Sequence, residues 1–151
     1  MSDSFRLATG RKLVSRADAQ ELGAVTHLLL DAAERRVSAV VVGKGRNAKL
    51  VDWAQVNSFG PDAIMVADEL ALHLPIDDRE RAAADGKLEV LGKHALTEGG
   101  NEIGTLDDVT FDPRTGAIEM LRVGAREIPA GALLGSGSYA VILDAGQDPT
   151  S

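Results

Sequence analysis

Apolar side chains recur along this chain at the short intervals of β-strands. Between residues 106 and 111, Leu106, Val109 and Phe111 are apolar and the residues between them are polar. A regular strand turns every second residue to the same face, so a step of three followed by a step of two indicates a β-bulge, which curls a short sheet. The next five residues, Asp112-Pro113-Arg114-Thr115-Gly116, are typical of a tight turn, because Pro presets φ and Gly accepts positive φ. The pattern predicts a hairpin whose second strand spans residues 117–124.

A similar pattern occurs earlier in the chain. Residues 25–30 show the same apolar spacing, residues 31–36 form a turn, and residues 37–42 are rich in the β-branched side chains that favour strands. A shift of 81 positions aligns the two stretches without a gap, and beyond the loop of residues 44–49 the shift becomes 77. We therefore predict two diverged copies of one strand-rich unit. The aligned pairs include Glu21-Leu22-Gly23 with Glu102-Ile103-Gly104, Lys12 with Lys93, Asp31 with Asp112, His27 with Asp108, and Trp53 with Ala130.

The boundaries of the copies follow from the pattern between and around them. The first copy spans residues 1–67, with its pattern beginning at residues 5–7, and the second spans residues 87–144, with its pattern beginning at residues 87–91. The joining segment, residues 68–86, contains Asp77 as a helix N-cap with Glu80 at the third position, so we expect a short helix over residues 79–84 that Gly86 ends. Residues 53–56 and 130–133 each indicate one helical turn. Residues 145–151 are expected to form a loose tail.

The ordered motifs of the first copy resemble those of the PRC-barrel family. They are Gly10-Arg11-Lys12-Leu13-Val14-Ser15, Glu21-Leu22-Gly23-Ala24-Val25, Asp31, Val51-Asp52-Trp53-Ala54-Gln55-Val56 and Gly60-Pro61-Asp62-Ala63-Ile64. The second copy is similar through Gly92-Lys93, Glu102-Ile103-Gly104, Asp112 and Ile128-Pro129-Ala130. The two matches cover nearly everything except the joining segment and the ends.

The resemblance implies a small, partly open β-barrel that serves for binding rather than for chemistry. Members of the family include the cytoplasmic domain of the photosynthetic reaction-centre H subunit and the C-terminal domain of a bacterial ribosome maturation factor. The chain shows neither the membrane helix of the first nor room for the N-terminal domain of the second, so what carries over is a binding module. The fold class expected is all-β: two small PRC-type barrels packed together, in one chain or completed by a second chain, with a short helix in the joining segment.

Composition and charge narrow the classes of partner. The chain has no cysteine, which excludes disulfides and thiolate chemistry. No apolar run approaches the roughly 20 residues that span a bilayer, and no signal peptide is apparent, so we expect a cytoplasmic protein. The net charge of −7 disfavours a broad nucleic-acid surface. Residues 1–67 carry +2 and residues 68–151 carry −9, which reflects either drift between the copies or docking of a basic half on an acidic one.

The histidines and aspartates that could serve in catalysis or metal binding are better explained by structural roles. His27, His73 and His94 show no metal-ligand spacing, so neither a metal site nor another cofactor is expected. Asp31 and Asp112 occupy equivalent positions just before a turn, where an Asp side chain caps backbone N–H groups. The neighbouring pair Asp107 and Asp108 is expected to be solvated surface. We therefore predict no catalytic residue.

The places where the copies differ are the candidates for partner binding. The loop of residues 44–49 carries Lys44, Arg46 and Lys49 and is shorter in the second copy; it is either a solvated hairpin tip or a contact to an acidic protein face or to RNA phosphate. Trp53, the single tryptophan, is either a core or barrel-end plug or an exposed interface residue.

These features lead to three functional classes. The leading expectation is a non-enzymatic adaptor or scaffold that binds another protein, with a homodimer as one form of that interaction. The alternative is a ribosome- or RNA-associated factor, and the third class is an enzyme or small-ligand binder.

Overall fold

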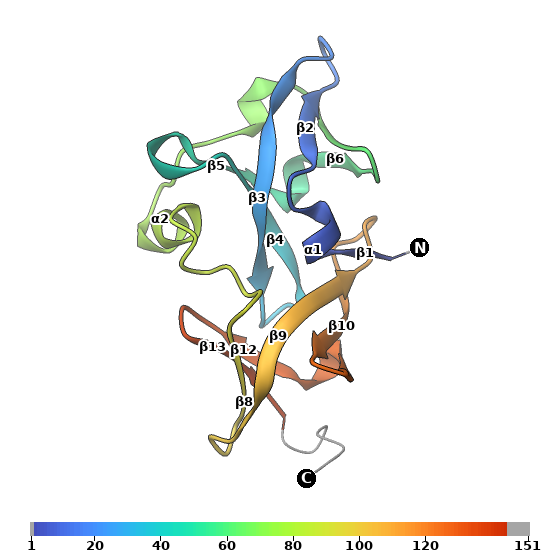
Figure 1. Ribbon diagram of the computed structural model, residues 1–151. Coiled ribbons are helices and arrows are strands. Elements are labelled where there is room, and N and C mark those ends of the chain that lie inside the picture. The colour runs from blue at the N-terminus through green and yellow to red at the C-terminus, as the bar shows by residue number, and fades with distance from the viewer. Residues whose placement is uncertain (1, 145–151) are drawn as a thin grey trace.

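The chain forms two curled β-sheets in a computed structural model that describes residues 2–144 (Figure 1). The first sheet has the strand order β5-β4-β3-β2-β7-β6 and the second has the order β11-β10-β9-β8-β13-β12, with β1 added beside β9. The strands of the first sheet are β2 (Lys12–Ser15), β3 (Glu21–Asp31), β4 (Arg36–Val42), β5 (Lys49–Asp52), β6 (Val56–Phe59) and β7 (Ala63–Val66). Those of the second are β1 (Asp3–Ser4), β8 (His94–Thr97), β9 (Glu102–Phe111), β10 (Ile118–Val123), β11 (Arg126–Pro129), β12 (Leu133–Ser136) and β13 (Ala140–Leu143).

Helical segments are short and lie between the strands. They are α1 (Phe5–Ala8), α2 (Asp78–Ala84) and the single 3-10 turns η1 (Gly45–Asn47), η2 (Trp53–Gln55), η3 (Glu69–Ala71) and η4 (Ala130–Ala132). The predicted all-β class is confirmed: two half-barrels are joined by a segment that contains one short helix. Asp77 caps α2 as expected, its carboxylate accepting the Glu80 N–H at 2.8 Å. The predicted tail, residues 145–151, lies outside the described residues.

The two sheets have the same topology. In each, the first strand pairs in parallel with the last, as β2 does with β7 and β8 with β13, and the remaining neighbours are antiparallel. The predicted bulge is present in both long strands. Pairing of β3 with β4 skips Thr26, between Val25 and His27, and pairing of β9 with β10 skips Asp107, between Leu106 and Asp108.

The repeated Glu-Leu/Ile-Gly motif marks a close crossing of strands. Gly23 has φ of +135° and Gly104 has φ of +145°. A Cβ on Gly23 would lie 2.6 Å from Cγ1 of Val42, and one on Gly104 would lie 2.9 Å from Cγ1 of Val123. Only glycine fits both the backbone and the space, so the motif is explained by packing.

The alignment of the first strands differs by one residue from the sequence prediction. Lys12 pairs with Ala24, and its structural equivalent in the second sheet is His94, which pairs with Thr105. The prediction that Lys12 matches Lys93 without a gap was therefore wrong. The cause is the turn between the two strands, which spans residues 16–20 in the first sheet and residues 98–101 in the second.

The two sheets meet through equivalent residues. Arg36 and Ala117, which the shift of 81 aligns, pair as an antiparallel bridge. On either side of it the Val37 N–H donates to the Gly116 carbonyl at 2.8 Å, and the Ile118 N–H donates to the Arg35 carbonyl at 2.9 Å. A surface that pairs with its own equivalent is the mark of two-fold symmetry. The halves are thus related by a pseudo-two-fold axis, as two subunits of a dimer would be.

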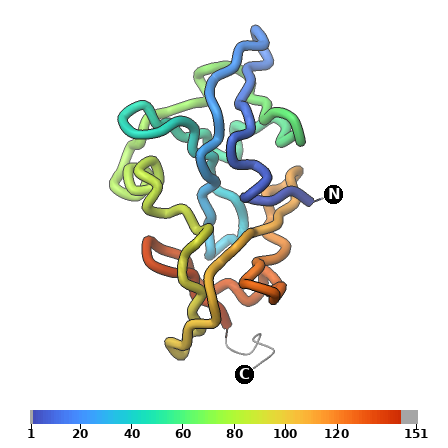
Figure 2. Tube along the Cα trace, viewed as in Figure 1, coloured from blue at the N-terminus to red at the C-terminus, as the bar shows by residue number. Residues whose placement is uncertain are grey.

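One hydrophobic core runs through both half-barrels. Its buried residues come from both sheets and from α1. Aromatic rings cross the junction: Phe59 of the first sheet lies 5.2 Å from Phe111 of the second, and Trp53 lies 5.6 Å from Phe59 and 6.3 Å from Phe111, measured between ring centroids. The tube trace shows the two halves stacked end to end (Figure 2).

Helix α2 covers the outer face of the first sheet only. Ala83 and Ala84 pack with Leu29, Val41 and Leu50 in a second buried cluster. The part of the first sheet formed by β3, β4 and β5 is therefore buried on both faces, which explains the nearly continuous apolar run of β4. Strand β10 instead contains the exposed residues Glu119 and Arg122 between its buried ones.

The N-terminal segment crosses to the second half. Residues 5–7, where copy one was expected to begin, lie in helix α1 (Phe5–Ala8), and β1 before it pairs with β9 of the second sheet. The Arg6 N–H donates to Oδ1 of Asp108 at 3.0 Å. Asp108 is 8% exposed, so its assignment to solvated surface was wrong: the carboxylate holds the crossing segment in place.

Candidate functional site

The basic loop lies at the tip of the hairpin that joins β4 to β5. Lys44, Arg46 and Lys49 are exposed, and none of them makes an ion pair with another residue in the described part of the chain. Ala48 anchors the loop in the cluster beneath α2. The three cations thus stand free on a short hairpin with a fixed base.

Trp53 lies away from that loop, just beyond the far end of β5. It is half-buried against the core. The ring also contacts the second half, because a Cβ on Gly116 would lie 2.9 Å from Cε2 of Trp53. The structure therefore does not bring the four predicted partner-binding residues together: three share one loop and the fourth fills the junction between the sheets.

The joining segment runs along the open edge of the first sheet. The Leu50 N–H of β5 donates to the His73 carbonyl at 2.8 Å, and the His73 N–H donates back to the Leu50 carbonyl at 2.9 Å. This bridge covers an edge that would otherwise offer unpaired backbone groups. Three aliphatic side chains of the segment nevertheless face solvent: Leu70 is 85% exposed, Leu74 57% and Ile76 78%.

An open hollow of about 730 Å³ lies beside the segment. Apolar side chains of Leu22, Leu70 and Leu72 line it, and Glu21, Lys49 and Glu69 supply charge. We name Leu70, Leu74 and Ile76 together with this hollow the linker surface. It combines apolar side chains with charged groups of both signs and includes Lys49 of the basic loop.

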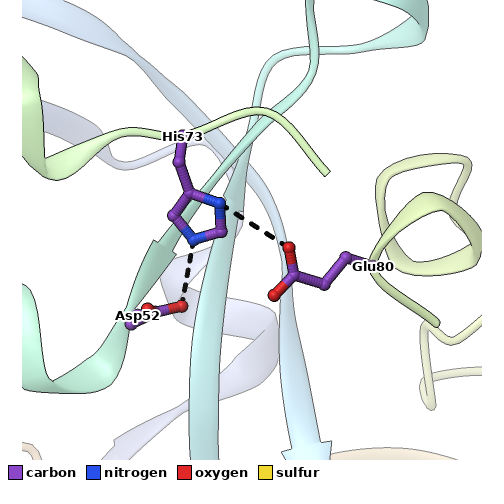
Figure 3. Close-up of side chains that lie close together, drawn as sticks. All are labelled: Asp52, His73 and Glu80. Atoms are coloured by element: carbon purple, nitrogen blue, oxygen red, sulfur yellow. Dashed lines mark hydrogen bonds and ion pairs between the residues drawn. The ribbon is translucent and has the colours of Figure 1, made fainter. Parts of the chain in front are cut away.

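His73 also lies between two carboxylates (Figure 3). Its Nε2 is 3.1 Å from Oδ1 of Asp52, at the end of β5, and its Nδ1 is 3.6 Å from Oε1 of Glu80, in α2. Nδ1 is also 2.9 Å from the Leu74 carbonyl. Glu80 is held by a hydrogen bond at 3.1 Å from the Ile76 N–H to its Oε1. The end of β5, the joining segment and α2 thus meet at one imidazole.

The surroundings of His73 favour its charged form. Burial is the largest single influence and lowers the pKa, but hydrogen bonds to the Leu74 carbonyl and to Asp52, with the negative charges of Asp52 and Glu80, raise the pKa above its ordinary value of 6.5. A proton on this imidazole is therefore stabilised.

Sequence spacing could not reveal this cluster. Metal-ligand spacings such as His-x-x-x-His join histidines near one another in sequence, whereas here a single histidine meets carboxylates seven positions later and 21 positions earlier. The weak signal was the Asp77-x-x-Glu80 capping pattern, because it fixes where α2 begins and hence which face Glu80 occupies.

The other two histidines have different surroundings. His94 lies 2.6 Å from Glu102, through Nδ1 and Oε1, and stacks on Tyr139. It takes the place of Lys12, which pairs with Glu21 at 3.3 Å. His27 is buried, and its Nε2 atom has no hydrogen-bond partner among the described residues.

Comparison with known proteins finds a family match in the first half. The family model described as PRC-barrel domain matches residues 9–70, which contain the whole of the first sheet. None of the curated proteins compared with the chain matches it significantly. Within residues 2–144, no helix is long and apolar enough to cross a membrane.

Proposed function

We propose that this protein is a non-enzymatic adaptor that binds another protein through the linker surface, and that its second half is a diverged second PRC-like barrel. The observation that carries the binding role is the exposure of Leu70, Leu74 and Ile76 on one segment. Scattered apolar side chains are normal on protein surfaces, but three on one short segment, of which Leu70 also lines the hollow, are typical of interaction sites.

The setting of these side chains favours a protein partner. The segment is tied to β5 by two backbone hydrogen bonds and to α2 by its capping residues, so its aliphatic groups are presented on a fixed backbone. When a partner buries these groups, this chain therefore loses little conformational freedom. Glu21, Lys49 and Glu69 around the hollow supply polar contacts that set orientation.

The hydrogen bonds of the aspartates considered as catalytic candidates support a role without catalysis. Asp31 accepts the Glu34 N–H at 3.1 Å and Asp112 accepts the Arg114 N–H at 2.8 Å, which confirms them as turn caps. Asp107 accepts the Gly124 N–H at 3.0 Å. These carboxylates, like Asp108, are engaged in holding backbone.

The test is a comparison of partners captured by variants of the intact protein. Wild type, the double variant Leu70→Asp with Ile76→Asp, and the control Leu134→Asp are used as bait in the native cell extract. Leu134 is also exposed, at 45%, but lies on β12 of the second sheet. We expect a protein partner that wild type and control retain and the double variant loses. Partners that all three baits capture equally, or none above background, would contradict the proposal.

The three free cations of the basic loop favour a second candidate, an RNA- or ribosome-associated factor. Lys44, Arg46 and Lys49 make a small positive patch on a protein of net charge −7, so binding would be weak and strongly dependent on salt. Fluorescence anisotropy with labelled RNA at low and high salt tests it. Binding at low salt that is lost when all three become Glu supports this candidate, and absence of binding at low salt removes it.

A further inference from the structure

We propose that Asp52, His73 and Glu80 form a binding site for one divalent transition-metal ion of the zinc type. One ligand atom of each residue lies within 4.8 Å of the others. An ion about 2.1 Å from each ligand atom requires ligand atoms no more than about 4.2 Å apart, so Glu80, which lies 3.6 Å from Nδ1, must turn toward Nε2 to reach the ion. Nε2 of His73 and Oδ1 of Asp52, at 3.1 Å, already have the separation of neighbouring ligands.

The hydrogen bond on the other ring nitrogen orients the histidine for this role. The Leu74 carbonyl can only accept, so Nδ1, 2.9 Å away, carries a proton. In the charged ring Nε2 donates its proton to Oδ1 of Asp52, 3.1 Å away. A metal ion would displace that proton and bind the same two atoms. Donation of the second ring N–H to a carbonyl is also the usual support of a metal-bound histidine.

The charge of the cluster favours a divalent ion over a proton. A neutral imidazole with two carboxylates carries −2, which one proton only half neutralises and one divalent ion neutralises fully. Glu80 is the least exposed of the three side chains and is anchored through the Ile76 N–H, so its charge is held close to the ring. The nitrogen ligand and the small number of oxygens favour zinc-type ions over Mg²⁺ and Ca²⁺, which prefer larger all-oxygen shells.

A bound ion would join three parts of the first half. Asp52 ends β5, His73 belongs to the joining segment and Glu80 belongs to α2. No equivalent exists in the second sheet, where Pro129 stands in the place of Asp52. The backbone of Leu74 and Ile76, two residues of the linker surface, supports this site, but its test involves no partner.

Zinc titration of the chelator-treated full-length protein tests the site. Calorimetry is expected to show one equivalent bound, and zinc at roughly 100 times its Kd should raise Tm by about 5 to 10 °C, with Mg²⁺ at the same concentration leaving Tm unchanged. Asp52→Asn, His73→Gln and Glu80→Gln keep shape and hydrogen-bonding ability, and each should weaken zinc binding at least tenfold. His94→Gln is the matched control, because His94 also lies against a carboxylate but against only one.

Three results would overturn the proposal: no zinc binding by wild type, binding of undiminished strength in His73→Gln, or loss of binding in His94→Gln as well. If His73→Gln fails to fold, NMR of the wild-type imidazoles decides. Zinc must then shift the Nε2 signal of His73 and leave the signals of His27 and His94 in place; any other pattern rejects the site.

Discussion

At the scale of single residues, the departures from two-fold symmetry compensate one another. Trp53 replaces Ala130 and contacts the second half at Gly116, which leaves space for its ring. At the symmetric place the equivalent of Gly116 is Arg35, which holds φ of +53° and donates from Nε to the Leu133 carbonyl at 3.1 Å. Trp53 therefore stands beside Gly116 on one side of the axis, whereas on the other side Ala130 replaces the tryptophan and Arg35 replaces the glycine. This complementarity fixes how the halves pack.

The Trp53–Gly116 contact makes a prediction about stability. Gly116→Ala places a Cβ 2.9 Å from the indole in a backbone with φ of +81°, so both crowding and strain oppose it. Gly124→Ala is the control, since Gly124 has φ of +60° but open space around it. Urea unfolding should show Gly116→Ala less stable than the control by about 1 to 3 kcal/mol. Equal losses would mean that the indole does not depend on this space.

His27 predicts a loss of stability in acid. Burial, the largest influence, lowers its pKa below 6.5; nearby Glu89 and the Ala83 backbone partly oppose this, and Lys93 adds to it. The unfolded chain therefore takes up this proton more readily than the folded one. The contribution of neutral His27 is complete above pH 6.5 and is lost as the pH falls through the lowered folded pKa.

Urea midpoints at about pH 5 and about pH 8 measure the effect. His27→Leu removes both the titration and the unpaired Nε2, so it should lose less stability in acid than wild type does, whereas exposed His94→Gln should follow wild type. An unchanged acid loss in His27→Leu would show that other groups cause it.

At the scale of elements, the sequence pattern predicted those features that depend on residues close together in the chain. The hairpins, the bulge, the capped helix α2 and the turn acids Asp31 and Asp112 all follow from residues close in sequence. The crossing of α1 to the second half, the burial of Asp108 and the cluster at His73 could not be predicted this way. Arg6 and Asp108 are 102 positions apart, and a contact between distant segments leaves no periodic signal in either.

The contact between α1 and β9 can be tested directly. Asp108→Ala leaves the Arg6 N–H without its acceptor in a partly buried place, which should cost about 1 to 3 kcal/mol. Hydrogen exchange at the Arg6 amide should accelerate, and Asp112→Ala, which removes an acid from an exposed turn, should leave that amide protected. Unchanged exchange in Asp108→Ala would show that other contacts hold α1.

At the scale of the whole molecule, two half-barrels behave as a dimer within one chain. Their arginines reach across to backbone carbonyls, Arg6 to Asp107, Arg35 to Leu133 and Arg36 to Thr115. The core is continuous between them. The joining segment and α2 cover the first sheet alone and break the symmetry of the surface. The symmetric part thus gives stability, and the asymmetric part gives the surface proposed for binding.

The central claim is that the two half-barrels fold as one unit around a shared core. Trp53 is the single tryptophan and lies at the junction, so its fluorescence reports the junction while far-UV circular dichroism reports all strands. In urea the two signals should change together in one transition with one midpoint. A change in Trp53 fluorescence at lower urea than the loss of circular dichroism would show that the halves separate before they unfold, and would contradict the claim.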